Sequence, residues 1–141
     1  MKRLLFVFGV LFFTSSCEDT KLTKISDSNF IGNWELKDRG ILEGIEIEIA
    51  RDEKGELHGE ITKLNDNKYV NLFMEVGDQL LTGIRRNSNY EFTITEKKIA
   101  APLFSIYGQS TSKDYKSIFD GENKIVLGKK GAEGFYVRIL D

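Results

Sequence analysis

The chain has 141 residues, of which 30% are charged and 40% hydrophobic. This balance excludes an intrinsically disordered chain and a polytopic membrane protein, and the length suits one domain rather than two. The single cysteine and the single histidine exclude an internal disulfide, a multi-cysteine metal site and a multi-histidine zinc site. We therefore expect neither a metal ion nor another cofactor.

The first residues read as a secretory signal. Lys2 and Arg3 precede an apolar run from Leu4 to Phe13, and the small residues 14–16 follow. This order of basic, apolar and small residues is typical of a signal peptide. As a helix, the apolar run spans about 15 Å, which is half of a bilayer's hydrocarbon core. A transmembrane helix is therefore the weaker interpretation, and we predict a signal peptide over residues 1–16.

Cys17 directly follows the small residues. This arrangement resembles the lipobox of bacterial lipoproteins, although Thr14 replaces the usual leucine. The resemblance implies cleavage before Cys17 and attachment of diacylglycerol to its sulfur, so that acyl chains anchor an exported protein in a bacterial cell membrane, the outer membrane being favoured. The alternative is an exported protein that is cleaved nearby and keeps a free thiol.

The mature chain is mildly acidic. Removal of Lys2 and Arg3 with the signal leaves 18 basic and 22 acidic residues, a net charge of −4. Such a domain has no electrostatic reason to bind nucleic acid. Residues 17–29 are polar and lack periodicity, so we predict a lipidated cysteine with a tether there, followed by one domain over residues 30–141.

From Phe30 onward the pattern is that of successive strands. Ile45, Ile47 and Ile49 alternate with two glutamates, which predicts a half-buried strand. Similar runs, separated by Gly, Asn and Asp turns, cover residues 57–61, 70–76, 80–84, 90–94, 104–108, 115–119, 124–127 and 135–139. This spacing predicts an all-β domain of about eight to ten short strands. Short connections and the removal of free edges favour a single antiparallel up-and-down β-barrel; a β-sandwich is the alternative.

The first and last strands carry a family resemblance. Gly32-Asn33-Trp34 opens the first strand and Arg138 lies on the last, a combination that resembles the lipocalin and calycin signature. The resemblance implies that Trp34 closes the bottom of the barrel and that Arg138 packs across it, a favourable cation–π contact. Residues 52–59 also resemble avidin-type barrels, but the tryptophans of that family's biotin site are absent. A simplified, lipocalin-like bacterial barrel fits best.

The polar residues do not predict a catalytic site. His58 shares a strand face with Glu60 and has no accompanying nucleophile. The glycine-rich stretch 128–134 carries lysines, but no predicted helix follows it to bind a phosphate. We therefore expect no catalytic residue, no metal ligand and no enzymatic activity.

Apolar stripes on several strands would converge inside a barrel. An interior of eight strands is either filled by side chains or able to hold one small ligand. Adjacent residues on a strand point to opposite faces, so one of Arg85 and Arg86 points inward, and we assign Arg85 to the head of an anionic ligand. The candidate ligand-binding residues are Val70, Leu72, Met74, Tyr90, Phe92, Phe104 and Arg85.

The sequence thus predicts a membrane-anchored, lipocalin-like barrel that binds a small apolar or amphipathic ligand. The alternative is an interaction module of the cell envelope, such as an inhibitor, immunity or assembly protein, with a filled barrel whose loops contact another protein. An enclosed cavity would favour the ligand. A packed interior with an exposed apolar loop patch would favour the interaction module.

Overall fold

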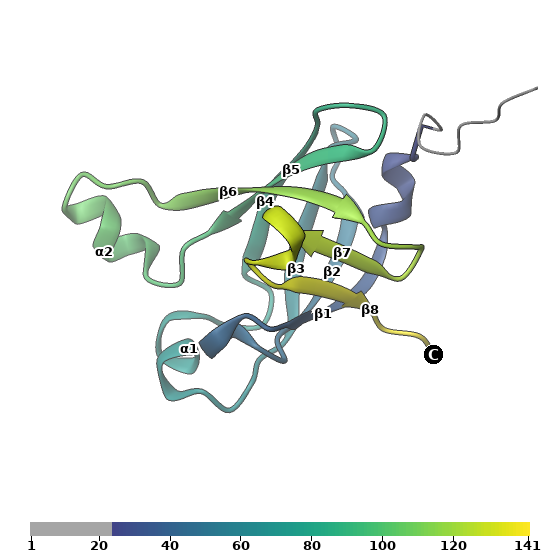
Figure 1. Cartoon of the computed structure of the whole chain (residues 1–141). Coiled ribbons are helices and arrows are strands. Elements are labelled where there is room, and N and C mark those ends of the chain that lie inside the picture. Colours follow the sequence, from purple (N-terminus) through teal and green to yellow (C-terminus); the bar gives the residue numbers. More distant parts are fainter. Residues whose placement is uncertain (1–23) are drawn as a thin grey trace, which may run out of the picture.

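The computed structural model describes residues 24–141, which form a closed barrel of eight antiparallel strands (Figure 1). Each strand pairs with its neighbour in sequence, and β1 closes the barrel against β8. The strands are β1 (Gly32–Lys37), β2 (Glu46–Arg51), β3 (Leu57–Lys63), β4 (Gln79–Arg86), β5 (Glu91–Lys97), β6 (Ser112–Phe119), β7 (Lys124–Leu127) and β8 (Phe135–Arg138). The predicted all-β, up-and-down barrel is confirmed, and the sandwich alternative is not. The barrel is compatible with the lipocalin-like fold that the sequence resembles.

Alternation of side chains explains why these segments form a barrel wall. In β2, Ile47 and Ile49 are buried while Glu48 is exposed. In β5, Phe92 and Ile94 are likewise buried in the core. Successive side chains of a strand point to opposite faces, so these strands turn a mainly apolar stripe inward. Each buried apolar side chain contributes about 1.5–3 kcal/mol.

The predicted strand over residues 70–76 is wrong, because this segment contains the helix α1 (Lys68–Phe73). The side chain of Asn67 accepts hydrogen bonds from the N–H groups of Tyr69 and Val70, at 2.9 and 3.2 Å, which is a helix N-cap. Val70 and Met74 are both buried, whereas Leu72 is 71% exposed. Residues four apart share a face in a helix and also in a strand. Over so short a segment, the apolar pattern of the sequence therefore does not distinguish the two structures.

The predicted strand from residue 104 is also wrong, because residues 101–106 form the helix α2 (Ala101–Ile106). Pro102 lies in its first turn, where the missing N–H has no intrahelical partner to lose. The flanking residues bring β5 and β6 together, since the N–H of Lys98 donates to the carbonyl of Thr111 at 2.8 Å. The helix therefore sits within the long connection of a hairpin.

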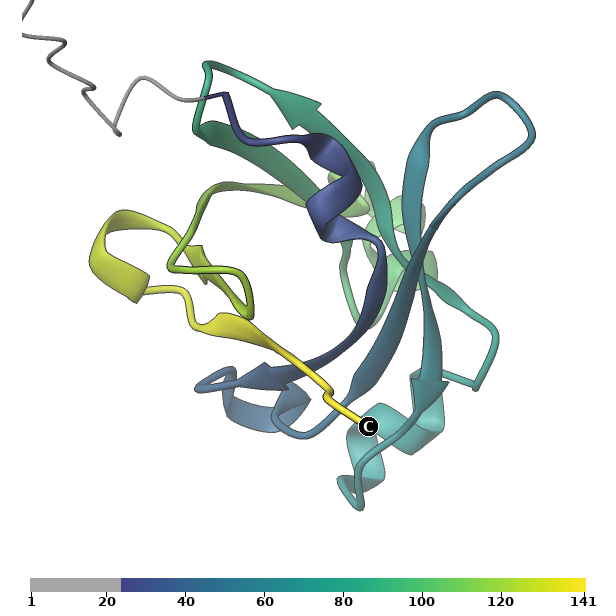
Figure 2. The same ribbon diagram turned by 90° about the vertical axis from the view of Figure 1, so that its right-hand side faces the viewer.

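The connections divide between the two ends of the barrel. Within residues 24–141 there are also three short 3-10 helices: η2 (Asp27–Phe30), η3 (Gly40–Leu42) and η4 (Lys129–Gly131). One end, here called the closed end, carries residues 24–31 with η2 and the tight turns 52–56, 87–90 and 120–123; Figure 2 shows η2 lying across it. The other, the loop end, carries the connections 38–45, 64–78, 98–111 and 128–134, with η3, α1, α2 and η4. No helix within residues 24–141 is long and apolar enough to cross a membrane.

The closed end is sealed by the residues of the Gly-x-Trp motif. Arg138 lies over the indole of Trp34, with its Cζ 4.2 Å from the ring centroid, and the indole Nε1 donates to the carbonyl of Phe30 at 2.7 Å. A Cβ on Gly32, which has φ 140°, would lie 2.6 Å from Nη1 of Arg138. Glycine suits this position because the positive φ would strain any other residue and because a Cβ would make the guanidinium of Arg138 shift.

Side chains fill the barrel interior. Phe30 packs on Phe92 and Phe119, with ring centroids 4.8 and 4.7 Å apart. The largest fully buried side chains are Trp34, Tyr136, Phe30, Phe92, Leu36, Ile45, Ile47, Ile49, Ile61, Leu80, Leu81 and Ile94. A ligand deep in the barrel would have to displace several of these side chains. Loss of the packing of one large buried side chain lowers the free energy of unfolding by about 2–5 kcal/mol.

Candidate functional site at the loop end

A buried polar cluster lies inside the barrel toward the loop end. The guanidinium of Arg39 donates to both carboxylate oxygens of Glu96, at 2.9 and 2.6 Å, and their side chains are only 7% and 4% exposed. The hydroxyl of Tyr136 donates to the same carboxylate. Cζ of Arg39 also lies 5.0 Å from the ring centroid of Tyr115. These four residues, the polar cluster, satisfy one another's charges and hydrogen bonds, as burial of charge requires.

Four separate elements bring the cluster together. Glu96 comes from β5, Tyr115 from β6 and Tyr136 from β8, while Arg39 reaches in from the connection after β1. Gly134, with φ 86°, makes room for the arginine, because a Cβ there would lie 2.3 Å from Cδ of Arg39. The cluster therefore depends on a glycine that is distant from Arg39 in the sequence.

Burial and the carboxylate of Glu96 act together on the pKa values of Arg39 and Tyr136. Burial works to lower the pKa of Arg39, but the hydrogen bonds and charge of Glu96 outweigh it, so that the pKa is raised above its ordinary value. Burial, followed by the charge of Glu96, raises the pKa of Tyr136 well above its ordinary value. Arg39 thus stays charged and Tyr136 stays protonated, which keeps the ion pair and its hydrogen bond intact over the physiological range.

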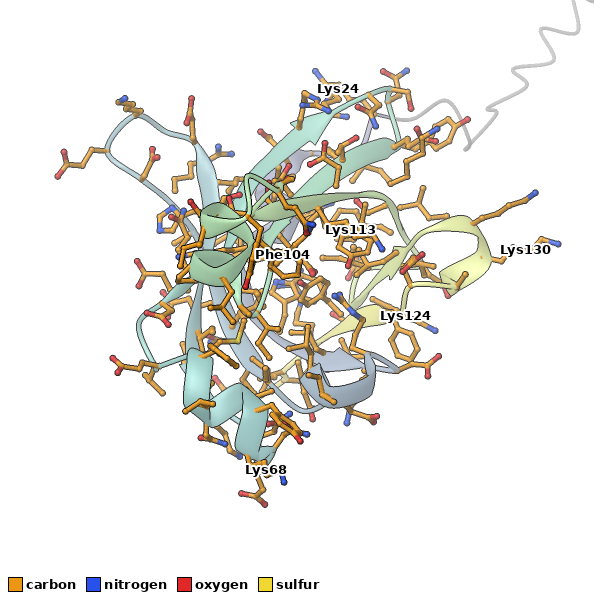
Figure 3. The ribbon with its side chains drawn as sticks, turned by 90° about the vertical axis from the view of Figure 1, so that its left-hand side faces the viewer. Lys24, Lys68, Phe104, Lys113, Lys124 and Lys130 are labelled. Atoms are coloured by element: carbon orange, nitrogen blue, oxygen red, sulfur yellow. The ribbon has the colours of Figure 1, made fainter. Side chains whose placement is uncertain are left out.

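An open pocket of about 360 Å³ lies above this cluster. Its walls are partly apolar and partly basic: Ile41, Leu42, Ile99 and Phe104 contribute the apolar side, Lys97, Lys98 and Lys113 the basic side, and Arg39, Glu96 and Tyr115 the base. Nζ of Lys98 lies 4.5 Å from the ring centroid of Phe104. In Figure 3 Phe104 and Lys113 lie close together at this opening. Such a pocket suits the charged head of an amphipathic anion.

Apolar side chains are exposed mainly at the loop end. Among the described residues, eight of the 12 large apolar side chains that are exposed belong to the loop-end connections. We call them the loop-end surface: Ile41, Tyr69, Leu72, Phe73, Val76, Leu103, Ile106 and Tyr107. Ile106 and Tyr107 are 76% and 79% exposed. Exposed apolar side chains gathered on one face mark binding surfaces, whereas scattered single ones do not.

The α2 connection stands out within this surface. It projects from the barrel on the side away from η2 (Figure 1). From Lys97 to Lys113 the chain has three lysines and no acidic residue. The connection therefore offers apolar side chains flanked by positive charge, a combination suited to an apolar surface with an acidic rim.

The predicted ligand-binding residues do not converge on one site. Val70, Met74 and Phe92 are buried in the core, while Leu72 is exposed at the loop end. Phe104 is the single member of the predicted set that lines the loop-end pocket. Strand alternation would have placed its members on one face, but Val70 and Leu72 lie in α1 and Phe104 in α2.

The other two predicted ligand-binding residues, Tyr90 and Arg85, lie elsewhere. Tyr90 is 49% exposed in a turn at the closed end. Arg85 is exposed on the outer face of β4, whereas its neighbour Arg86 turns inward, with Cζ 4.7 Å from the ring centroid of Phe92. The inward arginine is therefore Arg86, and it covers the core rather than an open interior.

Sequence reasoning missed the polar cluster. Glu96 continues the inward stripe of Phe92 and Ile94, and its side chain is 4% exposed. A carboxylate in an apolar stripe signals a buried partner, since unpaired buried charge is costly. The sequence could thus have indicated a buried ion pair, although it does not identify Arg39 as the partner.

Cys17 lies outside the described residues. Nε2 of His58 lies 3.6 Å from a carboxylate oxygen of Glu60, on the outer face of β3. Within residues 24–141 there is no group of three or more His, Cys, Asp or Glu side chains that could hold a metal ion.

No protein-family model, curated protein or solved structure significantly matches the chain. The chemistry of the loop end therefore carries the functional proposal.

Proposed function

We propose that this protein is a lipid-anchored binding module of the bacterial cell envelope, non-enzymatic and lipocalin-like, that contacts a partner protein through the loop-end surface. The observation that carries the proposal is the concentration of exposed apolar side chains on α1, α2 and η3. The filled interior supports it as well, because the large buried side chains occupy the space that a ligand would need in a lipocalin-like barrel.

The arrangement of the ends suits an anchored binding module. The described chain begins at Lys24, and the N–H of Ile25 donates to the carbonyl of Asn89 at 2.8 Å, at the closed end. Residues 17–23 could span at most about 25 Å when extended. A lipid on Cys17 would hold the closed end toward the membrane and leave the loop end facing a partner.

The proposal is tested with three purified proteins, namely the wild type, a double variant and a control variant. Each is cross-linked to isolated membranes, and the proteins that it captures are compared. The double variant Leu103→Asp/Ile106→Asp puts two charges on the loop-end surface. The matched control is Ile118→Asp, because Ile118 is 43% exposed on β6, away from the loop end. We expect one stoichiometric protein to be retained by the wild type and the control and lost from the double variant. Equal capture by all three would contradict the proposal.

A second candidate function is the binding of an amphipathic anion in the loop-end pocket. The favouring observation is the basic and apolar lining provided by Lys98, Lys113 and Phe104. Titration with dodecanoate should then show saturable binding that the double variant Lys98→Glu/Lys113→Glu abolishes. Binding that is unchanged in the variant would place the ligand elsewhere.

A further inference from the structure

The barrel wall is incompletely paired between β3 and β4. Within the described chain, the register between these two strands contains two pairs, Gly59↔Leu81 and Glu60↔Gln79. On their other edges, β3 pairs with β2 as far as Leu57 and β4 pairs with β5 as far as Arg86. Toward the closed end, each of these strands is therefore paired along one edge and unpaired along the edge that faces the other, among the described residues.

Hydrogen-bond alternation identifies the backbone groups that face this gap. The N–H of Asn87 donates to the carbonyl of Glu91 at 2.8 Å, and residues of an antiparallel strand face their two neighbouring strands alternately. Counting back from this bond, the backbone N–H and C=O groups of Arg85 face β5, whereas those of Ile84 and Arg86 face β3. Both residues lie beyond the last β3–β4 pair among the described residues, so no ladder partner meets them.

A cleft of about 410 Å³ lies where the two strands separate. Leu57 and His58 of β3 line one side, and residues 82–86 of β4 line the other. Figure 2 shows the β2–β3 hairpin turning away from the β4–β5 hairpin at this end. Nδ1 of His58 is buried and has no hydrogen-bond partner within the described chain. The cleft thus combines a free strand edge with an unmet polar group.

The cleft also has an apolar floor and an available cation. Leu57 is 6% exposed and forms part of the floor. Arg85 is exposed and forms no ion pair with any described residue. Of the three acidic lining residues, Asp27 is paired with Arg51 at 3.5 Å, Asp52 accepts two N–H groups of its own turn at 2.9 Å, and Glu56 forms no ion pair with any described residue. A carboxylate on a ligand could therefore reach Arg85 without displacing an existing partner.

We propose that this cleft accepts an extended segment of another polypeptide, which adds to β4 as a strand. The backbone groups of Ile84 and Arg86 supply main-chain hydrogen bonds, as in β-augmentation. Inward side chains of the segment lie on Leu57 and Ile84, and an outward acidic side chain reaches Arg85. The free stretch 83–86 matches a segment of about four residues. The site is separate from the loop-end surface and stands independently of the proposed function.

The test uses a fluorescently labelled, blocked hexapeptide of alternating valine and glutamate. A control peptide carries N-methyl groups on alternate amides, which removes donors without changing charge. We expect the first peptide to bind and the methylated peptide to bind at least about tenfold more weakly. Arg85→Glu should weaken binding of the first peptide, whereas the matched reversal Lys129→Glu, at an exposed lysine of the loop end, should not.

Amide hydrogen exchange of the folded protein supplies a second readout. The amides of Ile84 and Arg86 should exchange rapidly in the free protein and slowly with bound peptide, while the amide of Ile94, which faces β6, stays slow throughout. Three results would overturn the proposal. The first is slow exchange at Ile84 and Arg86 in the free monomer. The second is equal or absent binding of the two peptides up to about 1 mM. The third is protection that rises with protein concentration, because this result would assign the edge to a second copy of the chain.

Discussion

Gly134→Ala tests how the polar cluster is held together. A Cβ at this position would lie 2.3 Å from Cδ of Arg39 and 2.7 Å from the carbonyl oxygen of Asp38. The new methyl group and the aliphatic stem of Arg39 cannot occupy the same space, since Cγ of Arg39 would also lie 2.8 Å from the new Cβ. We expect Arg39 to leave the interior, so that Glu96 remains buried without its cation.

The expected magnitude has two parts. A non-glycine residue in the left-handed region, with φ 86° at Gly134, costs about 1–2 kcal/mol. Loss of one partner of a buried ion pair costs about 3–5 kcal/mol more, and Glu96 is 4% exposed. The free energy of unfolding should therefore fall by about 4–7 kcal/mol.

Gly55→Ala is the matched control. Gly55 also has a positive φ, 80°, but nothing lies within 4 Å of a Cβ there, so the backbone strain of about 1–2 kcal/mol acts alone. Urea unfolding followed by tryptophan fluorescence measures both variants, because Trp34 is fully buried in the core. In a Glu96→Gln variant, Gly134→Ala should lower the free energy of unfolding by a smaller amount, because no buried carboxylate loses its cation. Equal losses for Gly134→Ala and Gly55→Ala would refute this account of Arg39.

Three further predictions concern pH, the anchor and the closed end. Burial and then the charge of Glu96 raise the pKa of Tyr136 above 10; the unfolded chain releases this proton near pH 10 while the folded protein keeps it, so the free energy of unfolding should fall as the pH rises above about 10. Urea titrations at about pH 9 and pH 11 check this, and a Tyr136→Phe variant that loses stability just as steeply would assign the effect to other groups. Cys17→Ser should release the protein from membranes, as judged by fractionation, and a variant that still sediments with membranes would defeat the lipid anchor. Trp34→Ala should lower the free energy of unfolding by about 3–5 kcal/mol, whereas a near-neutral result would remove its role in closing the barrel.

The barrel could be predicted from the sequence because its strands are locally explicit. Ile47 and Ile49 alternate with glutamates, and the burial of β2 follows that alternation. Trp34 and Arg138 were predictable as neighbours because closure pairs the first strand with the last, and the two residues are indeed register partners. These features depend on the period of a strand and on one closure rule.

The loop end was less predictable. Val70 and Leu72 fit strand alternation, but the N-cap at Asn67 starts a helix that buries one and exposes the other. Arg39 and Glu96 are 57 residues apart in the chain, and no local pattern indicates that a positive-φ glycine at position 134 will admit the arginine. Such contacts arise from tertiary packing rather than local propensity, so a single sequence does not specify them.

The most direct test of the central claim is site-specific photo-cross-linking of the full-length protein in its native cells. A photoreactive residue replaces Ile106, which is 76% exposed at the loop end, or Leu140, which is 69% exposed near the closed end. We predict one discrete protein adduct from position 106, its loss when Leu103→Asp is added, and no such adduct from position 140. The same adduct from both positions, or none from position 106, would contradict a partner at the loop end.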